Sequence, residues 1–191
     1  MRVLKRVFAA ALIALPATGA SASNLSAECV AKDEAGCLIS MVLAYYAGRT
    51  YGIDIGVEER GSDKRSALYL AANKLSLAAL STETVEEMEA GEGVFQINPD
   101  RAQAASKRLR ALFGYEDDEG RLTTIAVNDR MGYALAYNIT AAFWNNFPAI
   151  RREVTALDRT DQPFTGLTMQ LHPGALKYFE SKGYVVPSGI R

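Results

Sequence analysis

The only histidine of the chain, His172, lies in the stretch LHPGALKYFE at residues 171–180. Histidine is the side chain that most often exchanges protons near neutral pH, which makes it the first candidate for catalysis. A catalytic histidine needs partners, and the sequence lacks a G-x-S-x-G motif, an H-E-x-x-H motif and a glycine-rich phosphate loop. We therefore expect no enzymatic activity. We interpret His172 as a structural residue that supports a helix beginning at Pro173 and ending at Gly183.

The first 22 residues have the composition of a secretory signal peptide. A positive start, an apolar core and a small-residue cleavage pattern follow one another: Arg2, Lys5 and Arg6, then residues 7–15, then Ala20 to Ala22. The apolar run is too short to cross a bilayer, and no later segment is long and apolar enough. We expect a mature chain of residues 23–191 that forms one periplasmic domain and is not embedded in a membrane.

The charge of the mature chain excludes one class of partner. Cleavage after residue 22 removes three of the 21 lysines and arginines and none of the 22 acidic residues, which leaves a net charge of −4. Nucleic-acid-binding proteins normally carry a basic surface, so we expect no nucleic-acid partner. An anionic membrane surface is disfavoured for the same reason.

Cys29 and Cys37 are the only cysteines. Because the N-terminus predicts export to an oxidising compartment, we interpret them as a short-loop disulfide. Two free thiols are the alternative. Two cysteines and one distant histidine make a poor ligand set, so we expect neither a metal site nor a cofactor.

Alternating helical and strand patterns predict an α/β domain with parallel strands flanked by helices. Strand patterns occupy residues 53–59, 75–80, 108–115 and 121–127, and helical patterns occupy residues 35–52, 60–74, 81–93 and 129–147, with Pro148 breaking the last of these. Residues 35–52 are apolar nearly all round, which is typical of a buried helix. Residues 23–33 are polar and predict a loose segment, and the acidic residues 116–120 predict a solvated turn.

The C-terminal stretch LHPGALKYFESKGY resembles the last motif of the TAXI family, the solute-binding proteins of TRAP transporters. Three upstream segments are similar to the family in the same order: IDIGVEERGSDKRSALYLAANKLSLAALSTET, RLRALFGY and YALAYNITAAFWNN. Family members have two α/β lobes that close on a ligand. Here RLTTIAVNDR runs almost directly into MGYALAYNIT, so the second lobe is missing. The resemblance implies a single periplasmic-binding-protein-like lobe with a helical C-terminal part.

The resemblance places a ligand site after the strand at residues 53–59. Gly61 would let a ligand approach the backbone, and Ser62 would open a helix whose first amides suit a carboxylate. Arg60 and Lys64 add positive charge there, and Thr82 follows the next strand. The simpler interpretation of residues 60–65 is a capped surface helix with solvated charges.

Two functions remain as expectations. The first is a periplasmic solute-binding subunit, or a reduced derivative of one, that binds a small organic anion or amino acid for a TRAP-type transporter. The alternative is a one-lobe interaction module that docks a protein partner, such as a membrane subunit or another periplasmic protein. A single lobe leaves much of a ligand exposed, so the first function predicts weak binding.

Overall fold

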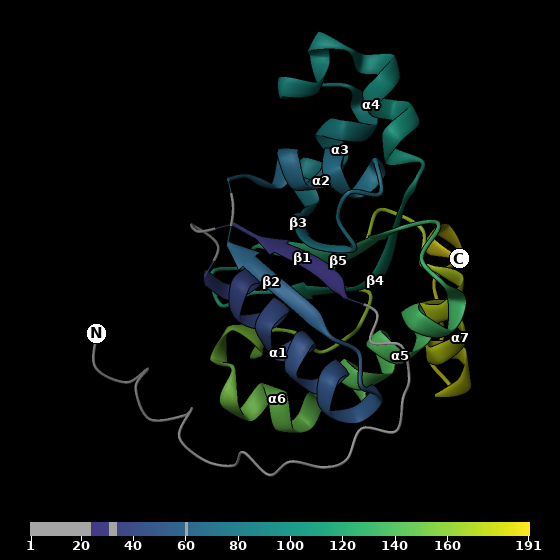
Figure 1. The fold of residues 1–191 in the computed structure, drawn as a ribbon. Coiled ribbons are helices and arrows are strands. Elements are labelled where there is room, and N and C mark those ends of the chain that lie inside the picture. Colours follow the sequence, from purple (N-terminus) through teal and green to yellow (C-terminus); the bar gives the residue numbers. More distant parts are fainter. Residues whose placement is uncertain (1–23, 31–33, 60) are drawn as a thin grey trace.

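The computed structural model describes residues 24–30, 34–59 and 61–191 (Figure 1). The predicted signal peptide and the predicted ligand residue Arg60 lie outside the described residues. Within the described part of the chain, no helix is both long and apolar enough to cross a membrane.

A five-stranded mixed sheet forms the centre of the molecule, in the order β2-β1-β3-β5-β4 (Figure 1). Its strands are β1 (Leu25–Cys29), β2 (Ile55–Glu59), β3 (Leu77–Ser81), β4 (Leu109–Glu116) and β5 (Leu122–Asn128). Strands β1, β2 and β3 are parallel, while β5 is antiparallel to both β3 and β4. The α/β prediction with parallel strands is confirmed for β1, β2 and β3. The sheet as a whole is mixed, because a tight turn joins β4 to β5 and a hairpin must be antiparallel.

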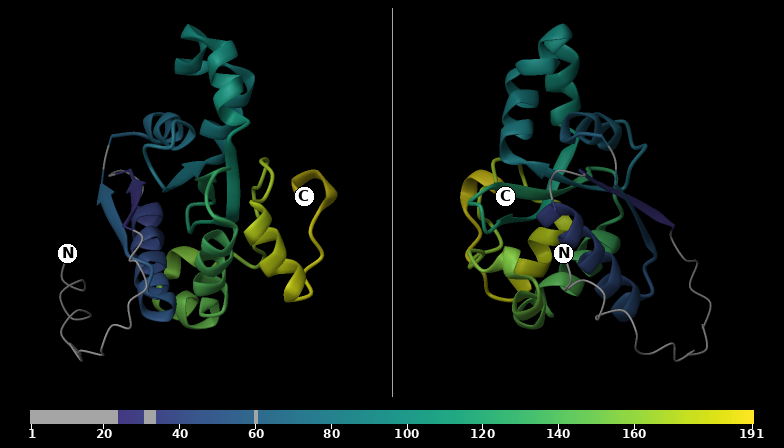
Figure 2. Two further views of the ribbon diagram at one scale, coloured as in Figure 1. Left: turned by 45° about the vertical axis from the view of Figure 1, so that its right-hand side comes forward. Right: turned by 90° about the vertical axis from the view of Figure 1, so that its left-hand side faces the viewer.

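Helices cover both faces of this sheet (Figures 1 and 2). On one side lie α2 (Asp63–Ala71), α3 (Thr82–Ala90), the 3-10 turn η1 (Gly93–Ile97) and α4 (Pro99–Ser106). On the other lie α1 (Glu34–Tyr51), α5 (Tyr133–Trp144), α6 (Phe147–Glu153) and α7 (Pro173–Ser181), with the 3-10 turns η2 (Thr155–Leu157) and η3 (Ser188–Ile190) in the C-terminal part. Buried apolar side chains from both layers form one continuous core. Pro148 lies in the first turn of α6, so the predicted helix break is confirmed.

Strand β1 occupies a segment that the sequence predicted to be loose, and that prediction is wrong. Leu25, Ala27 and Cys29 alternate with Ser26 and Glu28, which is the period of a strand. β1 lies between β2 and β3, and its last three residues are buried. Pairing on both sides stabilises a strand that is too short and too polar to be recognised alone.

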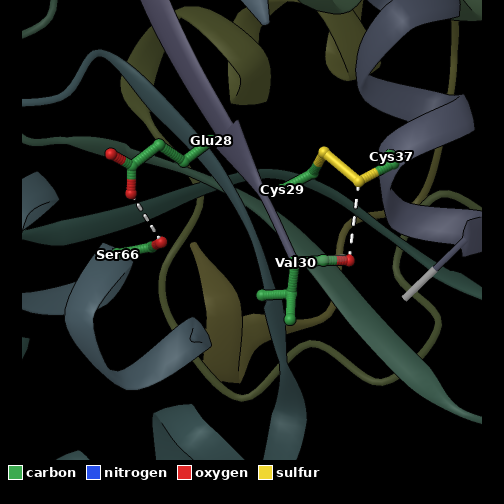
Figure 3. Close-up of a disulfide and its surroundings, with 5 residues drawn as sticks. All are labelled: Glu28, Cys29, Val30, Cys37 and Ser66. Atoms are coloured by element: carbon green, nitrogen blue, oxygen red, sulfur yellow. Dashed lines mark hydrogen bonds between the residues drawn. A yellow bond between two sulfur atoms is a disulfide. The ribbon is translucent and has the colours of Figure 1, made fainter. Parts of the chain in front are cut away.

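The predicted disulfide between Cys29 and Cys37 is present and ties the end of β1 to the first turns of α1 (Figure 3). The two residues are 8 positions apart. Closing a loop of this size restrains the unfolded chain by about 2.5 kcal/mol in the chain-entropy model. Glu28 points to the opposite side of β1, toward Ser66 of α2 (Figure 3).

The outer edge of β4 is covered by the chain that precedes α7. The amides of Ala111 and Gly114 donate to the carbonyls of Gln170 and Pro163 over 2.9 Å each, and the amide of His172 donates back to the carbonyl of Ala111 over 2.8 Å. An open strand edge is a template for unwanted pairing. The LHPG stretch therefore begins as a cover for the sheet edge and then turns into α7.

Candidate functional site

The carboxyl ends of β1, β2 and β3 meet at one edge of the sheet, where the sequence predicted a ligand site. The helices after β1 and β3 lie on opposite faces of the sheet (Figure 1). Ligands of open α/β sheets bind at such a change of direction. The structure therefore brings the start of α2, with Gly61 and Ser62, and the start of α3, with Thr82, to the edge where a solute site is expected.

Most of the predicted ligand groups at this edge already have partners. The Ser62 hydroxyl caps α2 by accepting a hydrogen bond from the amide of Arg65 over 3.4 Å. The Thr82 hydroxyl donates to the carbonyl of Gly166 over 3.0 Å. Gly61 has φ +20°, and a side chain there would meet nothing closer than Arg65 at 3.9 Å. The prediction of a helix cap at Ser62 is thus confirmed.

Lys64, one of the positive charges that were expected at this edge, is paired with a carboxylate. Lys64 Nζ lies 2.6 Å from Oε2 of Glu87 on α3. Asp63 Oδ2 accepts from the amide of Ser81 over 3.0 Å and joins the starts of α2 and α3. Nearby Glu28, only 6% exposed, accepts from the Ser66 hydroxyl over 2.9 Å. An organic anion entering here would meet acidic groups that the sequence analysis left out of the site.

His172 acts as the N-cap of α7. Its ring Nδ1 accepts a hydrogen bond from the amide of Gly174 over 3.1 Å, and its Nε2 lies 3.0 Å from the carbonyl of Met131. The neutral ring with its proton on Nε2 satisfies both contacts. The side chain is buried, so the expectation that His172 supports the C-terminal helix is confirmed.

Stability should depend on pH through His172. Burial lowers the pKa of His172 from 6.5, with the Met131 hydrogen bond opposing the shift. Between the folded pKa and 6.5 the unfolded chain binds more protons, so the free energy of unfolding should fall as the pH drops below 6.5. His172→Asn keeps a capping acceptor and removes the titration. Urea unfolding from pH 8 to 5 should show a shallower loss in this variant, and equal slopes in both proteins would contradict the assignment.

The outer face of α1 carries an apolar stripe that the sequence analysis expected to be buried. Ile39, Leu43 and Ala47 face the core. On the opposite side Leu38 is 38%, Met41 50% and Tyr45 55% exposed. The prediction of a fully buried helix is wrong for this side. We call Leu38, Met41 and Tyr45 the α1 stripe.

Two hollows lie away from the carboxyl-end edge. One, of about 560 Å³, is lined by charges of both signs, with Glu89 beside Lys107 and Arg110. Arg110 Nη1 already donates to the carbonyls of Lys107 and Leu109. The other, of about 660 Å³, lies between α2, η1 and α4. Neither hollow is lined by Gly61, Ser62, Lys64 or Thr82.

The acidic turn between β4 and β5 is more ordered than the predicted solvated turn. Asp117 is 1% exposed and accepts hydrogen bonds from the amides of Glu119 and Arg121 and from Nε of Arg121. Its role is to fold the turn. Across residues 24–30, 34–59 and 61–191, no cluster of three or more His, Cys, Asp or Glu side chains is arranged to hold a metal ion.

Comparisons with known proteins find no family model and no curated protein that matches the chain. The resemblance to TAXI solute-binding proteins therefore depends on the sequence segments alone. The geometry of the described residues is the main guide to function.

Proposed function

We propose that this chain is a one-lobe, non-catalytic interaction module of the periplasm that docks a protein partner through the α1 stripe. The observation that supports the proposal most is the exposure of Leu38, Met41 and Tyr45 on a helix whose sequence is apolar nearly all round. A helix of that composition normally has partners on every side. Among the described residues, this side of α1 stays between 38% and 55% exposed at Leu38, Met41 and Tyr45.

The chemistry of the α1 stripe suits a protein partner better than solvent. Its side chains are aliphatic, thioether and aromatic, and aromatic residues and methionine are enriched at protein interfaces. The Tyr45 ring packs edge-on against Tyr46 at a centroid distance of 5.2 Å, and its hydroxyl accepts from Arg49 over 3.0 Å. These contacts hold Tyr45 in one orientation, which lowers the entropy lost when a partner covers it.

The carboxyl-end edge supports docking over solute capture. Ser62, Lys64 and Thr82 are engaged within the chain, and Asp63 adds negative charge. The ion pair of Lys64 and the carboxylate of Asp63 make the described part of this edge less favourable for an anionic solute. The resemblance to TAXI proteins accounts for the fold segments, and the proposal is that the loss of the second lobe left a scaffold whose remaining role is binding another protein, for example a TRAP membrane subunit.

Export is part of the same proposal. A Cys29–Cys37 disulfide persists in oxidising compartments, and the first 22 residues have the signal-peptide pattern. The periplasm satisfies both observations.

Solute binding is the second candidate, because the hydrogen bond from Ser81 to Asp63 holds two helix starts together at the edge where α/β folds bind ligands. Under the docking proposal, the melting temperature of the mature protein should not rise with dicarboxylates, keto acids or amino acids at 1 and 10 mM, about the range that a half-site would need. A saturable rise in wild type that disappears in Ser62→Ala would instead favour the solute-binding subunit. Gly189→Ala, at an open surface position, is the control.

A further inference from the structure

The groove of about 660 Å³ between α2, η1 and α4 has an apolar lining that is open to solvent. Leu68 of α2 is 43% exposed, Val94 of η1 53% and Ile97 89%. Ala72 and Ala104 complete the wall without filling the space. The arm formed by α3, η1 and α4 extends away from the sheet, so the groove lies far from α1 (Figures 1 and 2).

Three cationic side chains line the same groove. Lys74 follows α2, Arg101 lies in the first turn of α4, and Arg108 precedes β4. No Asp or Glu is among the lining residues. Within the described part of the chain, no ion pair involves Lys74, Arg101 or Arg108. This is a local excess of positive charge on a chain that is acidic overall.

The position of Lys74 at the groove is defined by its surroundings. Its Nζ lies 5.8 Å from the centre of the Tyr69 ring, and Arg65 lies over the same ring at 4.7 Å. Tyr69 itself lines the groove. A cation attracted to an aromatic face stays close to it, so Lys74 is kept beside the apolar wall.

We propose that this groove binds a small amphipathic organic anion, a carboxylate with an aliphatic tail of medium length. The tail would cover Leu68, Val94 and Ile97, and the carboxylate would pair with Arg101, Lys74 or Arg108. The volume falls in the usual range of small-molecule sites, roughly 300–1,000 Å³. Charge complementarity selects the head group, because all the charged lining groups are positive. This site is independent of the docking function proposed for α1.

A concave site with three cations favours a small anion over the alternatives. A membrane surface is disfavoured because the acidic mature chain would be repelled by anionic lipids. A short hydrophilic anion would leave the apolar side chains of the groove exposed to water. Each methylene taken out of water strengthens binding by up to about fourfold, so the tail should dominate the affinity.

Calorimetric titration of the mature protein with octanoate, butyrate and 1-octanol tests the proposal. Octanoate should bind saturably at one site, with butyrate and 1-octanol each at least about tenfold weaker. Equal affinity for octanoate and 1-octanol would overturn the claim that the carboxylate pairs with the cationic side chains. Equal affinity for octanoate and butyrate would overturn the claim that the tail binds the apolar wall. Absence of saturable octanoate binding would overturn the whole proposal.

Two variants with matched controls locate the site. Arg101→Glu places an acidic residue in the first turn of α4, which helices favour, so the fold is preserved. It should weaken octanoate at least about tenfold, whereas Arg152→Glu on α6 should not. Ile97→Gln should also weaken octanoate, whereas Val185→Gln, at a position 91% exposed elsewhere, should not. If the controls weaken binding as much as the groove variants, the groove is not the site.

Discussion

Gly174→Ala should lower the free energy of unfolding by about 2–3 kcal/mol, although alanine is the better helix former. An added Cβ at Gly174 would lie 2.2 Å from the carbonyl oxygen of Tyr133 and 2.8 Å from the amide nitrogen of Tyr137. Both are backbone atoms of α5, which move only if the helix moves. α5 and α7 pack closely at this point, so the methyl group would push the helices apart.

The expected decrease in stability is opposite in sign to the usual effect of replacing glycine by alanine in a helix. In an uncrowded helix the same substitution would stabilise the protein by about 0.5–1 kcal/mol. Gly189→Ala is the control, because no atom lies within 4 Å of the Cβ that it would add. Urea unfolding of wild type and both variants measures the difference. A Gly174→Ala protein as stable as wild type would show that α5 and α7 are not in contact as described.

The LHPG stretch was predicted only in part from the sequence. Proline after a lone histidine predicted a helix start, and the structure has one there. The sequence also indicated that His172 is structural. It did not indicate that the ring caps the helix by its own Nδ1, or that Gly174 is required by the backbone of α5. The second contact of the ring, at Nε2, and the requirement for glycine at position 174 depend on Met131 and Tyr133, which are about 40 residues away in the chain.

The fold class followed from alternating helical and strand patterns, and four of the five strands were predicted close to their observed positions. β1 was missed because polar residues alternate with small ones in LSAEC, and its burial comes from neighbours on both sides. The sequence analysis located β4, β5 and the short turn between them but assigned no direction to β5, which the hairpin makes antiparallel to β4.

The candidate site was less predictable than the fold. The sequence placed Ser62 and Thr82 at the carboxyl ends of strands, and the structure agrees. Their partners came from distant segments, since Thr82 donates to Gly166, 84 positions along the chain. The sequence did not predict that the α1 stripe is exposed, because apolar residues on all sides of a helix predict burial. The periodicity of a sequence shows which face of a helix is apolar. Only the tertiary structure shows whether other elements pack against that face.

Site-specific photo-crosslinking in the cells that produce the chain should show a partner on α1. With benzoylphenylalanine in place of Met41, which is 50% exposed, we expect a discrete covalent adduct with a second protein. An adduct with a second copy of the chain would equally support docking through this face. Because half of the Met41 side chain is exposed and it is not among the buried core residues, the substitution should leave the fold intact.

The most direct test of the docking account compares three positions of the same photoreactive residue: Met41 on α1, Glu83 at the carboxyl-end edge and Val185 near the C-terminus, all exposed. The account predicts a single adduct of defined mass from position 41 in high yield, and none above background from positions 83 and 185. An adduct from position 83 without one from position 41 would place the partner at the edge where a second lobe would close. No adduct from position 41, or equal yields at all three positions, would contradict docking through the α1 stripe.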